Sequence, residues 1–335
     1  MLVVMQKNAN EEKINAVVNA IEKRGYTARL IAGGDRMSIG ILYNKGSIDA
    51  DHFLGFDGVK EVIPVTKPYK LVSREFKQEN TCITVGDAVF GNGSLPVIAG
   101  PCAVESENQI LSIAMSVKDA GATLLRGGAF KPRTSPYSFQ GLGENGLKLL
   151  AKARKETGLP IVTEAMDVET FDLVEAYADV IQIGARNMQN FSLLRRAGKS
   201  SKPVILKRGM SALLQEWLMA AEYIMEEGNN HVILCERGVR TFVKHSRNTL
   251  DLSVVSAVKK ESHLPIIVDP SHAAGVREQV ISLSYACAAA GVDGIMIEVH
   301  NNPEEAMSDG AQSLYPEQFK NVMEKMIAIH AIVGK

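Results

Sequence analysis

Long apolar runs and an excess of charge of either sign are both missing from this chain of 335 residues. No apolar run approaches the roughly 18–20 residues that a membrane-spanning helix needs. The N-terminal residues lack the basic start and the small-residue cleavage site of a signal peptide. With 37 basic and 38 acidic residues, the net charge of −1 attracts neither nucleic acid nor an anionic membrane. We therefore expect a cytoplasmic protein that binds no nucleic acid and no membrane.

Cysteine is also scarce. The four cysteines are Cys82, Cys102, Cys235 and Cys287, and no two of them form a CxxC pair. This spacing excludes a disulfide scaffold and favours a reducing compartment. The remaining composition, 46% apolar and 22% charged, is that of an average globular protein. A chain of this length can bury a large core and is expected to form about two domains.

From Leu95 onward, short β-branched runs alternate with longer amphipathic runs, a pattern typical of parallel βα units. Eight runs are predicted to be strands: 96–100, 122–128, 160–165, 180–184, 203–208, 231–236, 265–270 and 294–300. Helices are predicted between and after them, among them 107–120, 146–157, 211–227, 276–290 and 316–332. This number of units predicts an α/β protein with a (β/α)8 TIM barrel over residues 95–335. An open doubly wound sheet is the alternative, but its Gly-rich dinucleotide-binding turn is missing.

The N-terminal part of the chain follows a different pattern. Residues 1–66 show the element order βαββαβ, which predicts a small ferredoxin-like α+β domain. Residues 67–94 are expected to form a linker and then a hairpin over 81–93 across the bottom of the barrel.

Positively charged side chains gather where the predicted strands end, which in a (β/α)8 barrel is where the active site lies. Seven cations fall at or just after these ends: Arg126, Lys131, Arg133, Arg186, Lys207, Arg208 and Arg237. Burying several like charges together is costly unless anions accompany them. The group therefore predicts a ligand with more than one phosphate or carboxylate. The alternative is that these are ordinary strand-end residues whose charged groups reach the solvent.

One thiol, one imidazole and two carboxylates also follow predicted strands. Cys102 follows the first strand, His272 follows the seventh, and Glu298 and Asp309 lie in and after the eighth. Because the first and eighth strands are neighbours in a closed barrel, the fold brings these residues together, and the donor set suits a divalent transition metal. The alternatives are a buried small residue for Cys102, a histidine at a helix start for His272 and an arginine partner for Glu298.

Two other functions are open at this point. Lys207 at a strand end could form a Schiff base with a carbonyl substrate, as in a class I aldolase, if its pKa were lowered by the surrounding cations. The barrel could also be a catalytically silent sensor of an anion or an amino acid. A sensor, however, has no need for both a metal site and several phosphate-binding cations.

Motifs at successive predicted strands resemble one known family. They are IAGPCAVES (98–106), LLRGGAFKPRTSPYSFQGLG (124–143), QIGARNMQN (182–190), LKRGM (206–210), ILCERG (233–238), VDPSHAAG (268–275) and IEVH (297–300). Together they closely resemble 3-deoxy-D-arabino-heptulosonate 7-phosphate (DAHP) synthase of type I-beta, a short form with an N-terminal ferredoxin-like domain. The resemblance covers most of residues 67–335. It implies a transferase that condenses phosphoenolpyruvate with D-erythrose 4-phosphate and water, releasing phosphate, as the first step of the shikimate pathway.

The same resemblance implies roles for individual residues. The implied ligands of a divalent ion (Mn, Fe, Co or Zn) are Cys102, His272, Glu298 and Asp309. The implied phosphoenolpyruvate site consists of Arg126, Lys131, Gly184, Ala185, Arg186, Lys207 and Arg237. The implied erythrose 4-phosphate site consists of Arg133, Thr134 and Ser135, with Asp269 near the hydroxyls. Lys131, Cys102 and His272 are the implied catalytic residues, with Lys131 donating a proton to the aldehyde oxygen, while Glu164 and His300 are alternatives for orienting the water.

The nearest related enzyme, 3-deoxy-D-manno-octulosonate 8-phosphate synthase, shares the barrel but uses arabinose 5-phosphate, and it is the alternative function. The octulosonate enzymes carry KANRSS where this chain carries KPRTS at 131–135, and they normally lack the N-terminal domain. The resemblance also implies a homotetramer and feedback inhibition through the N-terminal domain by an aromatic amino acid, tyrosine or phenylalanine.

Overall fold

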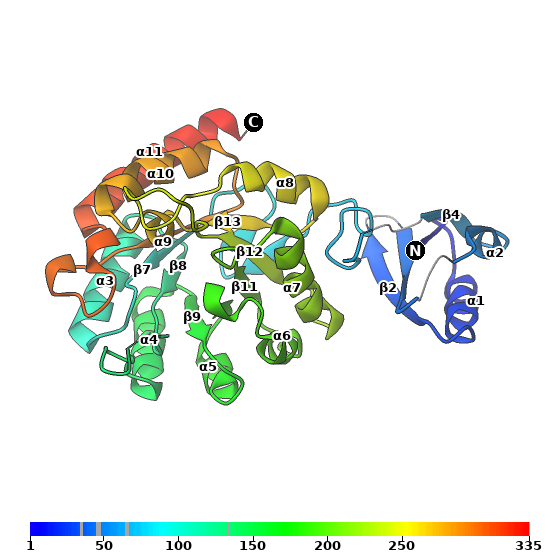
Figure 1. Ribbon diagram of the computed structural model, residues 1–335, viewed down its shortest axis with the longest axis horizontal. Helices are drawn as coiled ribbons and strands as arrows, with labels where there is room; N and C mark the ends of the chain where they lie inside the picture. Colours follow the sequence, from blue (N-terminus) through cyan, green and yellow to red (C-terminus); the bar gives the residue numbers. More distant parts are fainter. Residues whose placement is uncertain (34–35, 45–47, 64–66, 133–134, 335) are drawn as a thin grey trace. The chain divides into compact units, whose positions relative to one another are not determined.

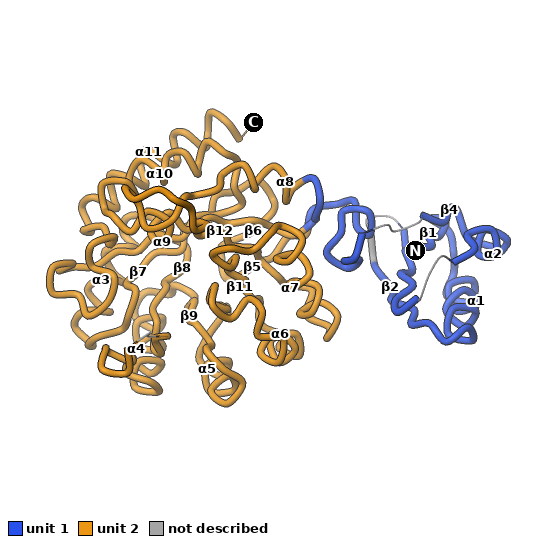
Figure 2. The backbone as a smooth tube through the Cα atoms, in the orientation of Figure 1, with its two compact units in different colours: residues 1–80, 260–263 blue, residues 81–259, 264–335 orange. Residues whose placement is uncertain are grey.

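The computed structural model describes residues 1–33, 36–44, 48–63, 67–132 and 135–334. The chain divides into two compact units (Figure 2): unit 1 comprises residues 1–80 and 260–263, and unit 2 comprises residues 81–259 and 264–335. The predicted domain limits at residues 66 and 94 stay predictions, and this division places residues 67–80 with unit 1. Within the described ranges, no helix combines the length and apolar character needed to cross a membrane.

Unit 1 contains a four-stranded antiparallel sheet and two helices. Its elements are β1 (Leu2–Met5), α1 (Glu11–Glu22), β2 (Thr27–Gly33), β3 (Arg36–Leu42), α2 (Ala50–Leu54) and β4 (Val59–Ile63). The strand order is β2-β3-β1-β4, with antiparallel pairs throughout. Each helix begins after a residue whose side chain accepts a backbone hydrogen bond: Asn10 accepts from Lys13 N, and Asp49 accepts from Asp51 N. The predicted ferredoxin-like order is confirmed.

Unit 2 contains a closed parallel barrel (Figure 1). Its strands are β7 (Val97–Gly100), β8 (Leu124–Arg126), β9 (Ile161–Ala165), β10 (Val180–Ile183), β11 (Val204–Lys207), β12 (Val232–Glu236), β13 (Ile266–Val268) and β14 (Ile295–Glu298). The barrel closes between β14 and β7, where Glu298 pairs with Gly100. Almost all strand residues are buried, which explains why the sequence shows continuous apolar runs rather than alternation. The predicted (β/α)8 barrel is confirmed.

Helices cover the outside of the barrel (Figure 1). They are α3 (Glu107–Asp119), α4 (Glu144–Thr157), α5 (Phe171–Tyr177), α6 (Phe191–Gly198), α7 (Leu214–Glu226), α8 (Ser253–Glu261), α10 (Arg277–Ala289) and α11 (Pro316–Val333). The short helix α9 (Pro270–Ala274) lies instead at the barrel mouth, where it carries His272. Short 3₁₀ turns follow strands β10 and β14: η1 (Ala185–Asn187), η2 (Pro303–Glu305) and η3 (Gly310–Gln312). Helix α7 is anchored by its buried Trp217, whose Nε1 donates to Leu206 O of β11 at 3.1 Å.

A hairpin fills the lower end of the barrel. It consists of β5 (Ile83–Val85) and β6 (Ala88–Phe90), paired antiparallel. Its apolar side chains form one buried cluster with residues from each of the eight barrel strands: Ile98, Leu124, Val162, Val180, Ile205, Ile233, Cys235, Ile267 and Met296. These barrel residues lie toward the start of their strands, so the hairpin and the functional side chains occupy opposite ends.

Candidate active site at the barrel mouth

A pocket of about 410 Å³ opens where the barrel strands end. Eight of the predicted site residues line it: Lys131, Gly184, Ala185, Arg186, Lys207, Arg237, His272 and Asp309. Arg133 and Thr134 fall outside the described residues, and Ser135 is exposed and does not line the pocket. The structure therefore brings six of the seven predicted phosphoenolpyruvate residues together in this pocket, all but Arg126, while two residues of the predicted erythrose 4-phosphate site fall on undescribed positions.

Two buried arginines offer unused hydrogen-bond donors. Nη1 of Arg126 and Nη1 of Arg237 are buried and have no hydrogen-bond partner in the described part of the chain. Arg237 lines the large pocket, whereas Arg126 lies deeper, with its Nη2 3.1 Å from Glu298 Oε1. An unpaired buried donor costs free energy, so these two atoms favour an anionic ligand.

The buried lysines already have partners. Lys207 Nζ lies 2.5 Å from Asp269 Oδ2. Asp269, which is fully buried, also accepts hydrogen bonds from the ring and the backbone N of His272. Burial opposes ionisation, but His272 and Lys207 hold the pKa of Asp269 well below its usual range. An ammonium already bound to a carboxylate suits anion binding better than Schiff-base formation.

Arg208 does not line the pocket, and its guanidinium is bound by carboxylates of the protein. Its Nη1 contacts Glu236 Oε2 at 3.0 Å and Asp251 Oδ2 at 2.9 Å, and its Nε donates to Ala212 O. Glu236 is fully buried and accepts a further hydrogen bond from Gly238 N, next to Arg237. This network therefore fixes the backbone that carries Arg237 rather than binding a ligand.

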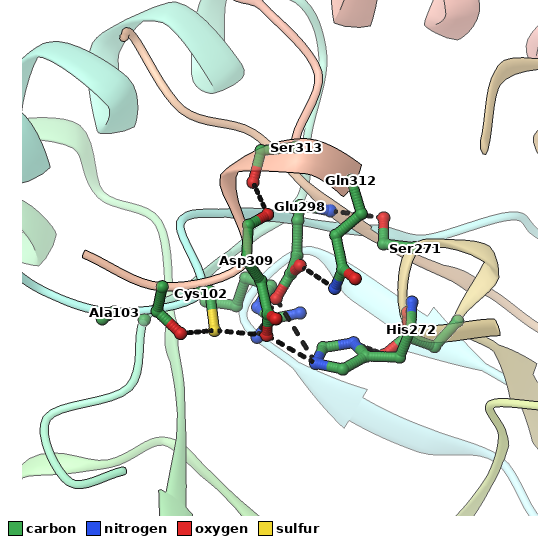
Figure 3. Close-up of polar contacts among 12 residues, drawn as sticks. Cys102, Ala103, Ser271, His272, Glu298, Asp309, Gln312 and Ser313 are labelled. Carbon is green, nitrogen blue, oxygen red and sulfur yellow. Dashed lines mark hydrogen bonds and ion pairs between the residues drawn. The ribbon is translucent and has the colours of Figure 1, made fainter. Parts of the chain in front are cut away.

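The four predicted metal ligands converge at one edge of the pocket (Figure 3). One ligand atom from each of Cys102, His272, Glu298 and Asp309 lies within 4.8 Å of the other three. Cys102 Sγ is 3.2 Å from Asp309 Oδ2, and His272 Nε2 is 3.4 Å from Glu298 Oε1 and 3.9 Å from Asp309 Oδ2. Ligands at about 2.0–2.3 Å from a tetrahedral ion lie roughly 3.3–3.7 Å apart, so the spacing fits a divalent ion.

The chemistry of the cluster also fits a metal. Glu298 is fully buried, and its Oε1 accepts no hydrogen bond from the described atoms, although it forms an ion pair with Arg126. Thiolate, imidazole and carboxylate are together a donor set that binds Zn, Fe, Mn or Co. Burial, then the charge of Glu298, raises the pKa of the Cys102 thiol to about 12. A bound cation would stabilise the thiolate that this surrounding otherwise disfavours.

Lys131 connects the cluster to the pocket. Its Nζ lies 2.9 Å from both Cys102 Sγ and Cys102 O, and the residue also lines the pocket. Burial alone would lower the pKa of Lys131, but the Cys102 sulfur and the Glu164 carboxylate raise it. The Lys131 ammonium group therefore lies between the four candidate metal ligands and the pocket.

Glu164 lies near the end of β9. Its Oε2 accepts from Gln182 Nε2 at 2.9 Å, and it lines the pocket. A Cβ atom at position 184 would lie only 2.2 Å from Glu164 Oε1, so Gly184 leaves room for this carboxylate. His300, the other candidate for orienting water, lies 3.3 Å from Glu105 and does not line the pocket.

Sequence reasoning missed several pocket residues. Arg240, Arg247 and Asn248 line the pocket from the loop between β12 and α8. Their positions follow no strand-end rule, because the loop runs for more than a dozen residues without a periodic pattern. Their polar character within a segment that follows a strand end was the one available signal.

Comparisons with known proteins identify the family of this chain. Residues 73–333 match the DAHP synthetase I family, and residues 1–67 match the DAHP synthase ferredoxin-like domain. The chain is 51% identical over 334 residues to phospho-2-dehydro-3-deoxyheptonate aldolase of Thermotoga maritima, covering 100% of this chain and 99% of that protein. It is 36% identical over 270 residues to 2-dehydro-3-deoxyphosphooctonate aldolase of Syntrophotalea carbinolica, covering 75% and 96% of the two chains.

Two solved structures match as well. The crystal structure of DAHP synthase from Thermotoga maritima has a TM-score of 0.79 and 49% identity, covering 99% of this chain and 98% of that chain. A truncated form of 3-deoxy-D-arabino-heptulosonate 7-phosphate synthase from the same organism has a TM-score of 0.74 and 49% identity, covering 79% and 97%. The resemblance found in the sequence is thereby confirmed. The chain belongs to the DAHP synthetase I family and is an enzyme of the DAHP synthase class, a transferase of aromatic amino acid biosynthesis.

Proposed function

We propose that this chain condenses phosphoenolpyruvate with D-erythrose 4-phosphate and water at the barrel mouth, giving DAHP and phosphate. The observation that carries the proposal is the junction of a cation-lined pocket with a four-donor cluster, since His272 and Asp309 belong to both. Two phosphorylated substrates repel each other, so a site that joins them needs several fixed cations.

Phosphoenolpyruvate is assigned to the deep side of the pocket. Arg126 and Arg237 offer their unpaired Nη1 donors there, with Lys207, Arg186 and the Gly184–Ala185 backbone beside them. Erythrose 4-phosphate is assigned to Arg133, Thr134 and Ser135. The reaction requires C3 of phosphoenolpyruvate to lie next to the aldehyde carbon.

Cys102, His272, Glu298 and Asp309 are proposed to hold a divalent ion (Mn, Fe, Co or Zn). Such an ion supplies Lewis acidity for the aldehyde oxygen. Lys131 Nζ donates a proton to that oxygen as the carbon–carbon bond forms, because it lies between the cluster and the pocket. Glu164 then orients the water that adds to C2, and phosphate leaves by cleavage of its C2–O bond.

The octulosonate synthase is the second candidate function. A relative named for that activity matches 75% of this chain at 36% identity. Against it stand the KPRTS sequence at 131–135 and the ferredoxin-like N-terminal match over residues 1–67.

A phosphate-release assay decides between these functions. Purified protein is given phosphoenolpyruvate with either erythrose 4-phosphate or arabinose 5-phosphate, before and after EDTA treatment and Mn²⁺ addition. We expect release with erythrose 4-phosphate, its loss in EDTA and its recovery with Mn²⁺. We also expect Cys102→Ala to lose turnover while its melting temperature stays near that of the wild type. Full activity in protein verified to be metal-free, or a preference for arabinose 5-phosphate, would contradict the proposal.

Unit 1 is proposed to bind a regulatory aromatic amino acid. A second pocket of about 340 Å³ lies within this unit. Its wall combines apolar side chains (Leu2, Ile63 and Phe76) with charged ones (Arg36, Glu61 and Lys77). Such a mixture suits an apolar amino acid whose ammonium and carboxylate both need partners. A homotetramer in the cytoplasm completes the proposal.

A further inference from the structure

Glu298 and Asp309, the two carboxylates of the candidate metal cluster, each have one oxygen that faces the cluster and one that faces away. Glu298 Oε1 points to His272 Nε2, while Glu298 Oε2 accepts from Gln312 Nε2 at 2.5 Å. Asp309 Oδ2 lies near Cys102 Sγ, while Asp309 Oδ1 contacts Arg247 Nη1 at 3.2 Å. The outward oxygens are thus fixed by two residues that do not belong to the cluster.

These two residues are also joined to each other. Arg247 Nη1 donates to Gln312 Oε1 at 3.1 Å as well as to Asp309 Oδ1. Gln312 ends η3, is 2% exposed, and lies beside Glu298 in Figure 3. The amide Nε2 of Gln312 donates to Glu298, and its Oε1 accepts from Arg247, which also contacts Asp309. The orientation of the amide is therefore fixed at both ends.

Asp309 needs such support, because its backbone is strained. Its φ of 54° and ψ of 33° place a non-glycine residue in the left-handed region. Locally, Ser313 Oγ donates to Asp309 O at 3.1 Å. The side chain, however, depends on Arg247 from the loop between β12 and α8. That loop is itself fixed near His272, since Asn248 Nδ2 donates to His272 O at 3.1 Å.

We propose that Arg247 and Gln312 are positioning residues that hold Glu298 and Asp309 with one oxygen each, Oε1 and Oδ2, turned toward a bound divalent ion. This inference rests on the proposed metal site and goes beyond it by assigning the orientation of two ligands to residues outside the ligand set. Outer partners that fix a ligand's orientation typically change metal affinity about 10- to 100-fold when they are removed.

The test measures metal binding rather than turnover. Co²⁺ is titrated into metal-free, full-length protein, and the sulfur-to-cobalt charge-transfer absorption and the dissociation constant are recorded by competition with a chelator. Gln312→Met keeps the side-chain length but removes both hydrogen bonds, and Arg247→Met removes the guanidinium at a partly exposed position. Arg247→Lys keeps the charge and one donor and should restore part of the affinity.

The matched control is Gln279→Met. Gln279 Nε2 donates to His245 O of the same β12–α8 loop at 2.7 Å but touches none of the four cluster residues. We expect Gln312→Met and Arg247→Met to weaken Co²⁺ binding about 10- to 100-fold and to alter the absorption spectrum, with no change for Gln279→Met.

Wild-type affinity and an unchanged spectrum in either variant would overturn the positioning role of that residue. If Gln312→Met does not fold, Arg247→Met alone decides the inference. Absence of a thiolate-to-cobalt band in the wild-type protein would instead overturn the metal proposal, and the inference with it, so the two failures are distinguishable.

Discussion

Buried charged side chains at the barrel mouth fall into two groups. In the first group the charge has a fixed protein partner, as for Arg208 with Glu236 at 3.0 Å. In the second group a buried donor has none in the described part of the chain, as for Nη1 of Arg126 and of Arg237. Charged side chains that have a protein partner stabilise the loops, whereas buried donors without a partner favour the binding of an anionic ligand. Residue type and position relative to a strand end could not separate these groups, because the partner of Arg208 comes from another strand.

One buried histidine makes the stability of unit 1 depend on pH. His263 is 3% exposed, and its Nε2 lies 2.7 Å from Leu71 O. Burial lowers the pKa of His263 from 6.5 to about 4. Below pH 6.5 the imidazole of His263 binds a proton in the unfolded chain but not in the folded chain. The free energy of unfolding is therefore highest above pH 6.5 and decreases as the pH is lowered toward 4. The loss reaches about 3 kcal/mol at about 1.4 kcal/mol per pKa unit.

Urea unfolding of the wild type and of His263→Gln at pH 7 and pH 4.5 measures this effect. When the pH is lowered from 7 to 4.5, the free energy of unfolding should decrease more in the wild type than in the variant, which has no imidazole to protonate at position 263. The same decrease in both proteins would show that other groups cause the pH dependence.

At the scale of elements, the sequence predicts the strands far better than the loops. Each of the eight predicted strands contains one observed strand, because runs of Val, Ile and Leu bounded by Gly or Pro form buried parallel strands with little ambiguity. The cluster of four candidate metal ligands could be predicted for the same reason, since its residues lie at strand ends or in the loops that follow them. Arg247 and Gln312 could not, because their contacts join two loops whose sequences carry no periodicity.

The end of strand β7 depends on a residue without a side chain. Gly100 has a φ of 147°, and a Cβ atom there would lie 2.2 Å from Arg126 O of β8. Gly100→Ala should therefore push β7 away from β8, lowering the free energy of unfolding by about 1–3 kcal/mol and disturbing the nearby Cys102. Urea unfolding and Co²⁺ binding measure the two effects.

Gly93→Ala is the control for this substitution. Gly93 also has a positive φ, 90°, but nothing lies within 4 Å of the position of its Cβ atom. This variant carries the backbone strain without the collision. Equal effects of the two substitutions would rule out the contact with β8 as the cause.

At the scale of the whole molecule, two units with different architectures are joined in one chain. The barrel carries all the residues assigned to catalysis, and the 51% identity to the Thermotoga maritima protein extends over 100% of this chain. A truncated form of a related enzyme that matches 79% of this chain has been solved, which supports independent folding of the barrel. Deletion of the N-terminal domain can therefore test the proposed regulation separately from the proposed catalysis.

Deleting residues 1–66 should leave phosphate release in place and remove inhibition by tyrosine or phenylalanine. The physical reason is that the second pocket lies within unit 1, whereas the catalytic pocket lies within unit 2. Initial rates of the full-length and truncated proteins are compared over a range of each amino acid. Unchanged sensitivity in the truncated protein would contradict a regulatory role for this domain.

The hairpin of β5 and β6 determines the end of the barrel at which reactants can enter and leave. Its apolar side chains pack with those of Ile98, Val162 and Ile233 and close the end of the barrel opposite the pocket. Everything that reaches the strand ends must then come and go past the same loops. If phosphoenolpyruvate binds beside Arg126, as proposed above, we expect it to bind before erythrose 4-phosphate, so that the two substrates bind in a fixed order.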